Sequence, residues 1–251
     1  MRNLIYRIYE RQLAGRLGYA SRPKHVAVIL DGNRRWAALK DGHTAKDGHT
    51  AGALKTREFL SWCDDLGIEL VTLYLLSTDN LSNRKSDELG DLLEVIDDLV
   101  QTLSESGRWK LQLVGDRSML PEKLSNTISF AEANTSKWKG MHVNLAVAYG
   151  GRHEITDAVK SILASHKDRS IDELAELLTP ELITKHLYTS GKPDPDLVIR
   201  TSGEQRMSGF LLWQSANSEF YFEEALWPDF RKIDFLRAIR AFESRHRRFG
   251  S

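Results

Sequence analysis

Apolar and polar positions follow two different patterns along this chain. Short continuous apolar runs, rich in β-branched residues, recur between longer stretches whose apolar residues are three or four positions apart. The short runs indicate strands buried on both faces, and the spaced stretches indicate amphipathic helices. This alternation predicts an α/β fold, a single domain with a mainly parallel central sheet of about six strands flanked by helices. The predicted strands are His25–Leu30, Glu69–Leu76, Lys110–Val114, His142–Ala148, Leu197–Ile199 and Phe210–Trp213.

The predicted helices have recognisable starting points. The clearest one spans residues 87–104, where apolar residues recur on one face and Ser86 stands as the N-cap. Two further helices are predicted, one after Pro121 and one near Arg152 after a Gly-Gly break. Sheets of this kind bind ligands at the carboxyl ends of their strands, so functional side chains are expected at that edge.

A tandem repeat interrupts the pattern. The hexapeptide KDGHTA occupies residues 40–45 and again residues 46–51. It is too short for a solenoid unit, and its two Asp-Gly pairs favour a turn or loop over an uninterrupted helix. We therefore do not expect the two histidines of the repeat, His43 and His49, to be equivalent.

Composition restricts the function more than the fold. The 251 residues include 35 basic and 35 acidic side chains, so no overall field favours nucleic acid as a partner, and any charge-based function must be local. The single cysteine, Cys63, excludes an internal disulfide and a thiolate metal cluster and is typical of a reducing compartment. Its apolar neighbours predict a buried side chain.

The N-terminal segment has a character of its own. In residues 1–22, which we expect to precede one domain over residues 23–251, five arginines against one glutamate give a local formal charge of +4. Leucine and isoleucine alternate with them at near-helical spacing, which fits either a membrane-surface helix or a helix docked on the domain. No apolar run approaches a membrane span and no signal peptide is evident, so we expect a cytoplasmic protein, with the inner face of the cell membrane as a peripheral site for that helix.

Candidate chemistry begins directly after the first predicted strand, at Asp31-Gly32-Asn33-Arg34-Arg35-Trp36. Asp31 can hold a divalent cation, and Gly32 lets the backbone approach a ligand. The following amides and arginines can bind diphosphate oxygens. This combination predicts a metal-diphosphate site, although Asp-Gly after a strand is also an ordinary turn.

Three other segments carry polar groups. Arg200 and Arg206 lie six residues apart in a loop after the strand at residues 197–199, which suits a second phosphorylated ligand, the alternative being a solvated surface loop. Ser77 and Asn80 follow another strand and could bind substrate or relay a proton, although turns and caps use the same residue types. Glu219 is a candidate second carboxylate for a cation, the alternative being a surface acid.

Several long motifs, in this order along the chain, resemble the cis-prenyltransferases, also called the undecaprenyl diphosphate synthase family. The resemblance runs from about His25 to Gly250 and rests on HVAVILDGNRRW, GHTAGA from residue 48, LYLLSTDN, NLAVAYGGRHEI, DPDLVIRTSGEQRMSGFLLWQ, LWPDF and RRFG. It implies an Mg²⁺-dependent enzyme that condenses isopentenyl diphosphate with an allylic diphosphate in Z geometry. It also implies an apolar tunnel in the core and a homodimer, in which Arg248 of the terminal Arg-x-Gly reaches a site across the interface.

The resemblance also implies roles for individual residues. Asp31 would be the Mg²⁺ ligand on which catalysis most depends, with Glu219 near the metal and with Ser77 and Asn80 assisting proton removal. The expected substrate-binding residues are Gly32, Asn33, Arg34, Arg35, Trp36 and His49 for the allylic diphosphate, Arg200, Arg206 and Ser208 for isopentenyl diphosphate, and Ser77, Thr78, Asp79 and Asn80 beside them.

Departures from the family pattern bear on product length. Long-chain members usually have Ala-Phe-Ser where this chain has Leu75-Leu76-Ser77, and Trp where it has Leu81. A leucine facing the tunnel at position 75 would fill the volume that an alanine leaves open. The chain looks most like short-chain actinobacterial (2Z,6E)-farnesyl diphosphate synthases, with geranyl diphosphate as the expected primer. A long-chain synthase for a cell-wall carrier lipid is the alternative.

Two other departures concern the binding sites. An arginine expected a few residues before the Gly-His pair is missing, and Ala45 and Lys46 stand near its expected position. Gln205 stands where some relatives have a histidine. The family also includes silent, binding-only subunits, but these lose the metal aspartate or many of the arginines. This chain retains Asp31, Arg200 and Arg206, so an active enzyme is expected.

Overall fold

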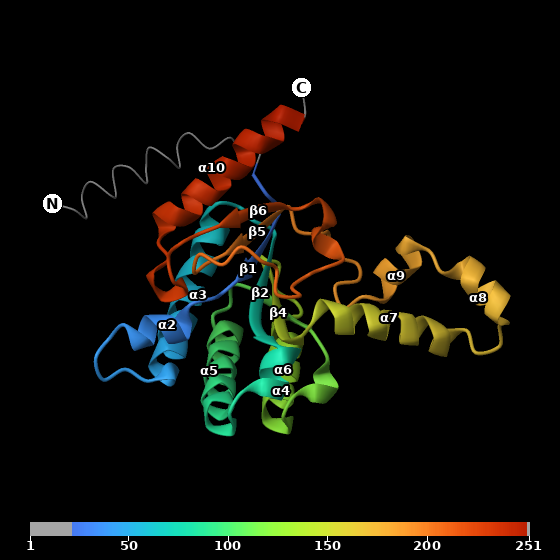
Figure 1. Ribbon diagram of the computed structural model, residues 1–251, viewed down its shortest axis with the longest axis horizontal. Coiled ribbons are helices and arrows are strands. Elements are labelled where there is room, and N and C mark those ends of the chain that lie inside the picture. Colours follow the sequence, from blue (N-terminus) through green and yellow to red (C-terminus); the bar gives the residue numbers. More distant parts are fainter. Residues whose placement is uncertain (1–21, 250–251) are drawn as a thin grey trace.

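The computed structural model describes the backbone of residues 22–249 and the side chains of residues 22–245. Six strands form one sheet in the order β3-β4-β2-β1-β5-β6, and all neighbours run parallel. The α/β fold and the predicted sheet are therefore confirmed (Figure 1). The strands are β1 (His25–Ile29), β2 (Leu70–Ser77), β3 (Lys110–Val114), β4 (His142–Tyr149), β5 (Leu197–Arg200) and β6 (Glu219–Phe222).

Strand β1 lies between β2 and β5 in the sheet, and both of its faces are covered. Val26 and Val28 belong to the main core, and Ala27 and Ile29 belong to a smaller core. Successive side chains of a strand point to opposite faces, so these two cores lie on opposite sides of the sheet. Full burial on both sides explains why β1 reads as an uninterrupted apolar run.

Nine α-helices of the described residues surround the sheet. Those predicted from the sequence are confirmed as α5, α6 and α7, although α5 begins one residue early, with Lys85 as its N-cap in place of Ser86. Cys63 is buried in the main core, as predicted, and burial raises the pKa of its thiol. The helices are α2 (Asn33–Ala38), α3 (Ala45–Asp65), α4 (Thr78–Asn83), α5 (Ser86–Glu105), α6 (Glu122–Thr135), α7 (Gly151–Ser165), α8 (Ile171–Leu177), α9 (Pro180–His186) and α10 (Lys232–Phe249).

One predicted strand was wrong. Residues 210–213 form turns, and the sixth strand is β6, a few residues later. The backbone explains the difference, because Ser208 and Leu211 have positive φ angles of 48° and 44°, which no strand accommodates. The apolar run at residues 210–213 is buried for another reason, since Phe210 and Leu211 pack in the smaller core.

The turn or loop predicted for the repeat is confirmed in its first copy but not in its second. The first copy forms a turn with Gly42 at a φ of 74°, but the second copy lies inside α3. A capping box starts this helix, because Thr44 accepts a hydrogen bond from the Asp47 amide while the Asp47 side chain accepts from the Thr44 amide. The cap stabilises a helix start that Asp-Gly pairs alone would disfavour.

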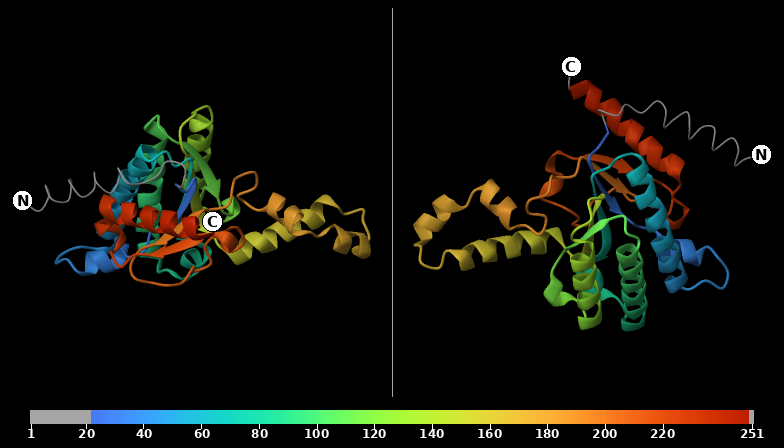
Figure 2. Two further views of the ribbon diagram at one scale, coloured as in Figure 1. Left: turned by 90° about the horizontal axis from the view of Figure 1, so that it is seen from above. Right: turned by 180° about the vertical axis from the view of Figure 1, so that it is seen from behind.

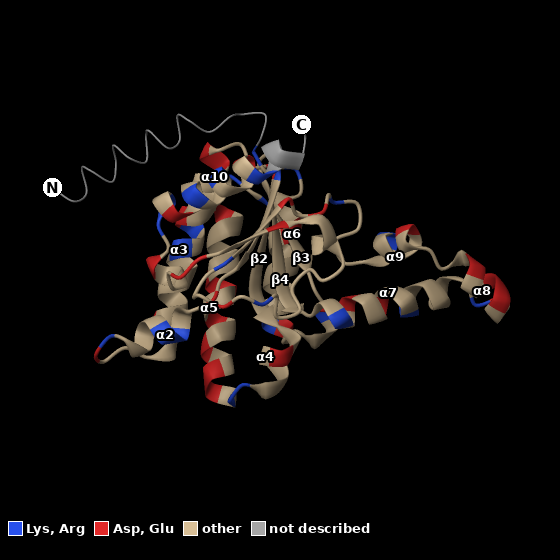
Figure 3. Ribbon diagram, turned by 45° about the horizontal axis from the view of Figure 1, so that its top comes forward, with Lys and Arg blue, Asp and Glu red and all other residues tan. Residues whose placement is uncertain are grey.

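Helices α7, α8 and α9 project from the rest of the molecule as an arm (Figures 1 and 2). Basic and acidic positions are interspersed over the ribbon, in agreement with the balanced composition (Figure 3). Within residues 22–249, no helix combines the length and apolarity that crossing a bilayer requires. The predicted N-terminal helix, with the membrane contact considered for it, lies outside the described residues apart from Arg22.

Candidate active site

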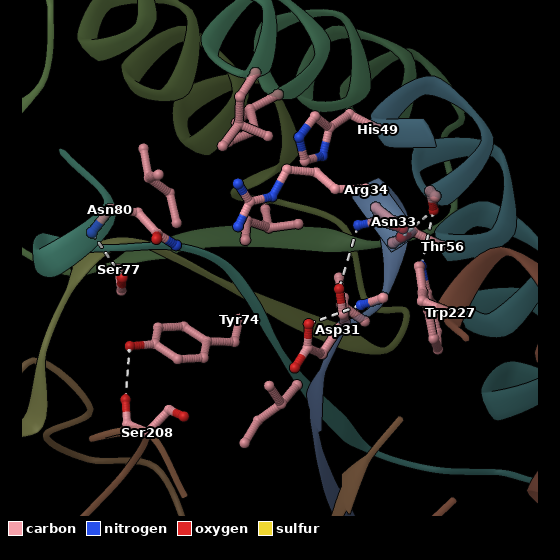
Figure 4. Close-up of a pocket in the computed structure, with 18 of the residues that line it drawn as sticks. Asp31, Asn33, Arg34, His49, Thr56, Tyr74, Ser77, Asn80, Ser208 and Trp227 are labelled. Carbon is pink, nitrogen blue, oxygen red and sulfur yellow. Dashed lines mark hydrogen bonds between the residues drawn. The ribbon is translucent and has the colours of Figure 1, made fainter. Parts of the chain in front are cut away.

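A cavity of about 770 Å³ opens at the carboxyl ends of β1, β2 and β5. It is lined by Asp31, the arginine loop after β5 and the polar segment after β2, so the fold brings three predicted segments together at the predicted edge. Figure 4 shows the labelled side chains around this space. The predicted site residues that line it are Asp31, Gly32, Asn33, Arg34, Arg35, His49, Ser77, Asp79, Asn80, Arg200, Arg206 and Ser208.

Asp31 lies at the junction of two strands. Arg200 donates a hydrogen bond of 2.8 Å to its Oδ2, and the Gly32 amide donates one of 2.7 Å to its Oδ1. Arg35 is 3.7 Å from the same carboxylate. Burial acts to raise the pKa of Asp31, but the hydrogen bond and charge of Arg200, with contributions from Ser202 and Arg35, outweigh it, and the pKa lies below its ordinary value. The group is therefore a carboxylate at neutral pH.

Arg200 organises the loop that follows β5. Only 4% of its side chain is exposed, and besides Asp31 it donates to the Ser208 hydroxyl at 2.8 Å and to the Arg206 carbonyl. A guanidinium can serve such partners at once because its donors point in fixed, separate directions. The solvated surface loop considered as an alternative is excluded for Arg200, whereas the Arg206 side chain is 67% exposed.

The opposite side of the cavity carries a second group of cations. Arg84 lies 3.3 Å from Nε2 of His49, and Arg34 stands beside that ring (Figure 4). Burial, followed by the charges of Arg84 and Arg34, lowers the pKa of His49 to about 4. His49 is therefore neutral at physiological pH, and the two arginines supply the positive charge on this side.

Sequence reasoning did not identify Arg84. It is the C-cap residue of α4 and lines the cavity, four residues after Asn80. Burial and the charge of Arg34 lower its pKa, and its Nε has no hydrogen-bond partner. The signal available in the sequence was its position, because an arginine one helical turn after Asn80 can face the same side as that residue.

The first turn of the site is tightly packed. Gly32 has a φ of 108°, and a Cβ there would meet Leu226 at 2.9 Å. Gly48 and Gly52 of α3 pack against Asn33, where added Cβ atoms would lie 2.2 Å from its carbonyl oxygen and 2.3 Å from its Oδ1. Glycine at these three positions therefore lets α3 and the Asp31 turn come close together.

The polar segment after β2 caps a helix as well as facing the cavity. Ser77 is the N-cap of α4 and accepts a hydrogen bond of 3.0 Å from the Asn80 amide. Thr78 is buried and does not line the cavity. Tyr74, which sequence reasoning also missed, does line it, and its hydroxyl donates to the Ser208 carbonyl at 3.3 Å. Burial raises the pKa of this phenol to about 12, so it remains neutral.

The structure distinguishes the two histidines of the repeat. His49 is buried against the cavity, whereas His43 is exposed and packs edge-on against Trp36, with ring centroids 5.9 Å apart. Trp36 is not among the lining residues, and its Nε1 donates to Asp229 at 2.8 Å. Lys46 does not reach the cavity either, because it pairs with Glu94 at 2.6 Å and Asp91 at 3.4 Å on α5.

Glu219 and Arg248 are not brought to this cavity in the described chain. Glu219 begins β6 opposite Leu197, three residues back from the edge that Asp31 follows, and pairs with Arg245 at 2.8 Å. Three strand residues correspond to about 10 Å. Arg248 lies in the last turn of α10, and its side chain is outside the described part. Among the described residues, no three His, Cys, Asp or Glu side chains are placed to hold a metal ion.

Beyond the polar groups, the cavity has an apolar wall. Leu75, which is half-buried, and Leu76 come from β2, and Trp227 closes one side with its Nε1 bonded to the Gly52 carbonyl at 2.9 Å. The apolar lining residues are Ile29, Leu30, Ala53, Leu75, Leu76, Leu92, Val95, Ile96, Leu99 and Trp227. A cationic mouth next to an apolar wall suits a ligand with an anionic head and a hydrocarbon tail.

Comparison with known proteins identifies the family. The model of the undecaprenyl diphosphate synthase family matches residues 29–250. The chain is 52% identical to Isoprenyl transferase 1 of Streptomyces avermitilis over 100% of this chain and 98% of that protein. It is 54% identical to the (2Z,6E)-farnesyl diphosphate synthase of Thermobifida fusca over 98% of this chain and 97% of that protein.

A solved structure agrees with this result. Lavandulyl diphosphate synthase from Lavandula x intermedia, in complex with dimethylallyl diphosphate, superposes with a TM-score of 0.81 at 38% identity, over 89% of this chain and 96% of that one. The chain belongs to the undecaprenyl diphosphate synthase family, the cis-prenyltransferases, and is a prenyltransferase enzyme.

Proposed function

We propose that this enzyme condenses isopentenyl diphosphate with geranyl diphosphate to give (2Z,6E)-farnesyl diphosphate. The observation that carries the proposal is the cavity at the carboxyl edge of the sheet, where five arginines adjoin an apolar wall that contains Leu75. Two relatives support the short product, since proteins 54% and 50% identical to this chain are named (2Z,6E)-farnesyl diphosphate synthase.

The two groups of arginines suit the two head groups. Arg34 and Arg84, beside neutral His49, would bind the allylic diphosphate, and Arg200 with Arg206 and Ser208 would bind isopentenyl diphosphate. Held in this way, both hydrocarbon chains extend toward the apolar wall with their reacting carbons close together. The bond from the allylic carbon to the diphosphate breaks as the isopentenyl double bond attacks that carbon, and the diphosphate leaves with the electron pair of the broken bond. The isopentenyl unit then loses a proton, for which the released diphosphate is the available acceptor.

The residues contribute charge and position to this reaction. Arginines directed at the leaving diphosphate stabilise the negative charge that develops on its oxygens. Ser77 and Asn80 face the cavity near the second head group, where they would assist proton removal, and the protonated phenol of Tyr74 would hold the Ser208 backbone in place.

The donor set at Asp31 fits Mg²⁺. Magnesium is commonly bound by one or two carboxylates together with substrate phosphates, and Asp31 supplies a carboxylate that is 33% exposed and kept ionised by its arginine neighbours. Bound there with a diphosphate, Mg²⁺ would help to neutralise the leaving group. Because Glu219 lies at the opposite end of its strand, we propose that it would reach such a cation only from a second copy of the chain, as in the homodimer expected from the family.

Product length depends on the apolar wall. Leu75 of β2 and the α5 residues Leu92 and Ile96 occupy space that a longer prenyl chain would need. We propose that they end elongation after one isopentenyl addition, because further units would overpack the cavity.

The test is a product assay. Pure protein is incubated with Mg²⁺, isopentenyl diphosphate and geranyl diphosphate, and the products are sized and compared with Z and E standards. A dominant C15 product of Z geometry is expected. Products far beyond C15 would support a long-chain carrier-lipid synthase, and the absence of turnover would support a silent binding subunit.

A further inference from the structure

Glu204 occupies the space between two arginines at the mouth of the cavity. Its Oε1 lies 3.9 Å from Nη1 of Arg35, and its Oε2 forms a short ion pair with Arg206. The side chain lines the cavity and is 30% exposed. Nothing in the site described above requires a carboxylate at this position.

The charges around the cavity are unevenly distributed. Five arginines line it against three carboxylates, namely Asp31, Asp79 and Glu204. In the described part of the chain, Arg34 and Arg84 form no ion pair with a lining carboxylate, since the partner of Arg34, Glu88, lies 3.5 Å away outside the lining. Arg35, Arg200 and Arg206 share Asp31 and Glu204 instead. On this side the protein neutralises its own anion-binding groups.

The backbone that carries Glu204 is held by hydrogen bonds, whereas its side chain is partly exposed at the cavity. The amides of Ser202 and Gly203 donate to the carbonyls of Ala225 and Glu223, both at 2.9 Å, and Arg35 donates to the Ser202 carbonyl at 3.3 Å. A diphosphate that engaged Arg35 and Arg206 would therefore displace the Glu204 carboxylate and leave the loop itself in place.

We propose that Glu204 is an internal competitor of the diphosphate head group. It pairs with Arg35 and Arg206 in the free enzyme, yields them to the diphosphate groups of the substrates and returns to them as inorganic diphosphate and the prenyl product leave. This role rests on the proposed function, in which Arg206 binds isopentenyl diphosphate, and on the role at the allylic diphosphate that the family resemblance implies for Arg35. Glu204 then weakens ground-state binding and speeds product release, because a ligand gains only the difference between its own contacts and those it replaces.

The opposing role is that of a clamp, in which Glu204 holds both arginines in position for the ligand. The two roles predict opposite effects of Glu204→Gln, which keeps the size of the side chain and removes its charge. The matched control is Glu224→Gln, because Glu224 lies beside Gly203, is exposed and does not line the cavity.

The experiment is calorimetric titration of the full chain with inorganic diphosphate, with and without Mg²⁺. Glu204→Gln is expected to bind roughly three- to tenfold more tightly than wild type in both conditions, as two partly exposed ion pairs would allow, with stronger product inhibition by inorganic diphosphate. Glu224→Gln should match wild type.

Unchanged or weaker binding by Glu204→Gln would overturn the competitor role, and weakening only with Mg²⁺ would assign Glu204 to the cation. If wild type and both variants all fail to bind inorganic diphosphate, the proposed function fails and the inference fails with it. Thermal unfolding of each variant checks that the fold is retained.

Discussion

Arg200 and Asp31 are 169 residues apart in the chain and are joined by a hydrogen bond of 2.8 Å at the carboxyl edge of the sheet. The contact exists because β1 and β5 are neighbours and Ile29 pairs with Arg200. Arg200 is nearly fully buried, so the Asp31 charge compensates a guanidinium that would otherwise be isolated from water. One pair thus keeps the carboxylate ionised and orders the loop that carries Ser208.

Replacing Asp31 with asparagine should reduce kcat by about a hundredfold or more, because the side chain keeps its shape but loses the charge that would hold the cation. The measurement is steady-state turnover with both diphosphates and Mg²⁺. Asp65→Asn, which removes a surface partner of Lys232, is the control and should leave turnover unchanged. An Asp31→Asn enzyme as active as wild type would refute the proposed metal site.

Replacing Arg200 with lysine should raise the KM for isopentenyl diphosphate roughly tenfold, because a single ammonium cannot reproduce the fork that reaches Asp31, Ser208 and the Arg206 carbonyl. The free energy of unfolding should also fall by about 1–3 kcal/mol, since buried partners are left unsatisfied. Kinetics and urea unfolding measure the two effects separately. A KM that stays at the wild-type value would separate Arg200 from substrate binding.

Replacing Arg84 with glutamine should raise the KM for the allylic diphosphate by roughly tenfold, the effect of losing one hydrogen bond to a charged group. Lys46→Gln is the matched control, because Lys46 pairs with Asp91 and Glu94 and does not line the cavity. The opposite result, a large effect at Lys46 and none at Arg84, would mean that the lysine replaces the missing arginine.

Replacing Leu75 with alanine should lengthen the product, because it opens volume in the apolar wall beside α5. Chromatographic sizing of products from geranyl diphosphate with excess isopentenyl diphosphate measures the effect. Leu89→Ala, at a half-buried position of α5 that does not line the cavity, should keep the wild-type product. A Leu75→Ala enzyme that still stops at C15 would remove this leucine from chain-length control.

Acid should destabilise the protein through His25. Burial lowers the pKa of this histidine to about 4, whereas the unfolded chain titrates near its ordinary value of 6.5. The unfolded state therefore takes up a proton first as the pH falls below about 6.5, and the free energy of unfolding declines until about pH 4. The expected loss from this group between pH 7.5 and pH 5 is about 2 kcal/mol. Urea unfolding should show a shallower pH dependence in His25→Gln, and an identical dependence would contradict the assignment.

Much of the fold could be predicted from local patterns. Five of the six strands and the helix α5 were placed within one residue of their observed bounds, and the starts of α6 and α7 were placed as closely, because burial on both faces or on one face imposes a periodicity that can be read in the sequence. The sixth strand could not be placed in this way. The run at residues 210–213 is as apolar as a strand, and only the positive φ angle of Leu211 and the packing of the run in the smaller core show that it forms turns.

The sequence by itself determined the family through its long motifs, and it predicted a metal-diphosphate site, since Asp31 and the arginines after β1 and β5 stand where strand ends must meet at one edge. Only the tertiary structure decided which of those side chains share a cavity. It places His49, and not His43, in the lining of the cavity, together with Arg84, Tyr74 and Glu204. It also places Glu219 at the end of its strand that lies away from the cavity. The reason is physical: periodicity records burial along one segment, whereas a site depends on strand register and helix packing between residues distant in the chain.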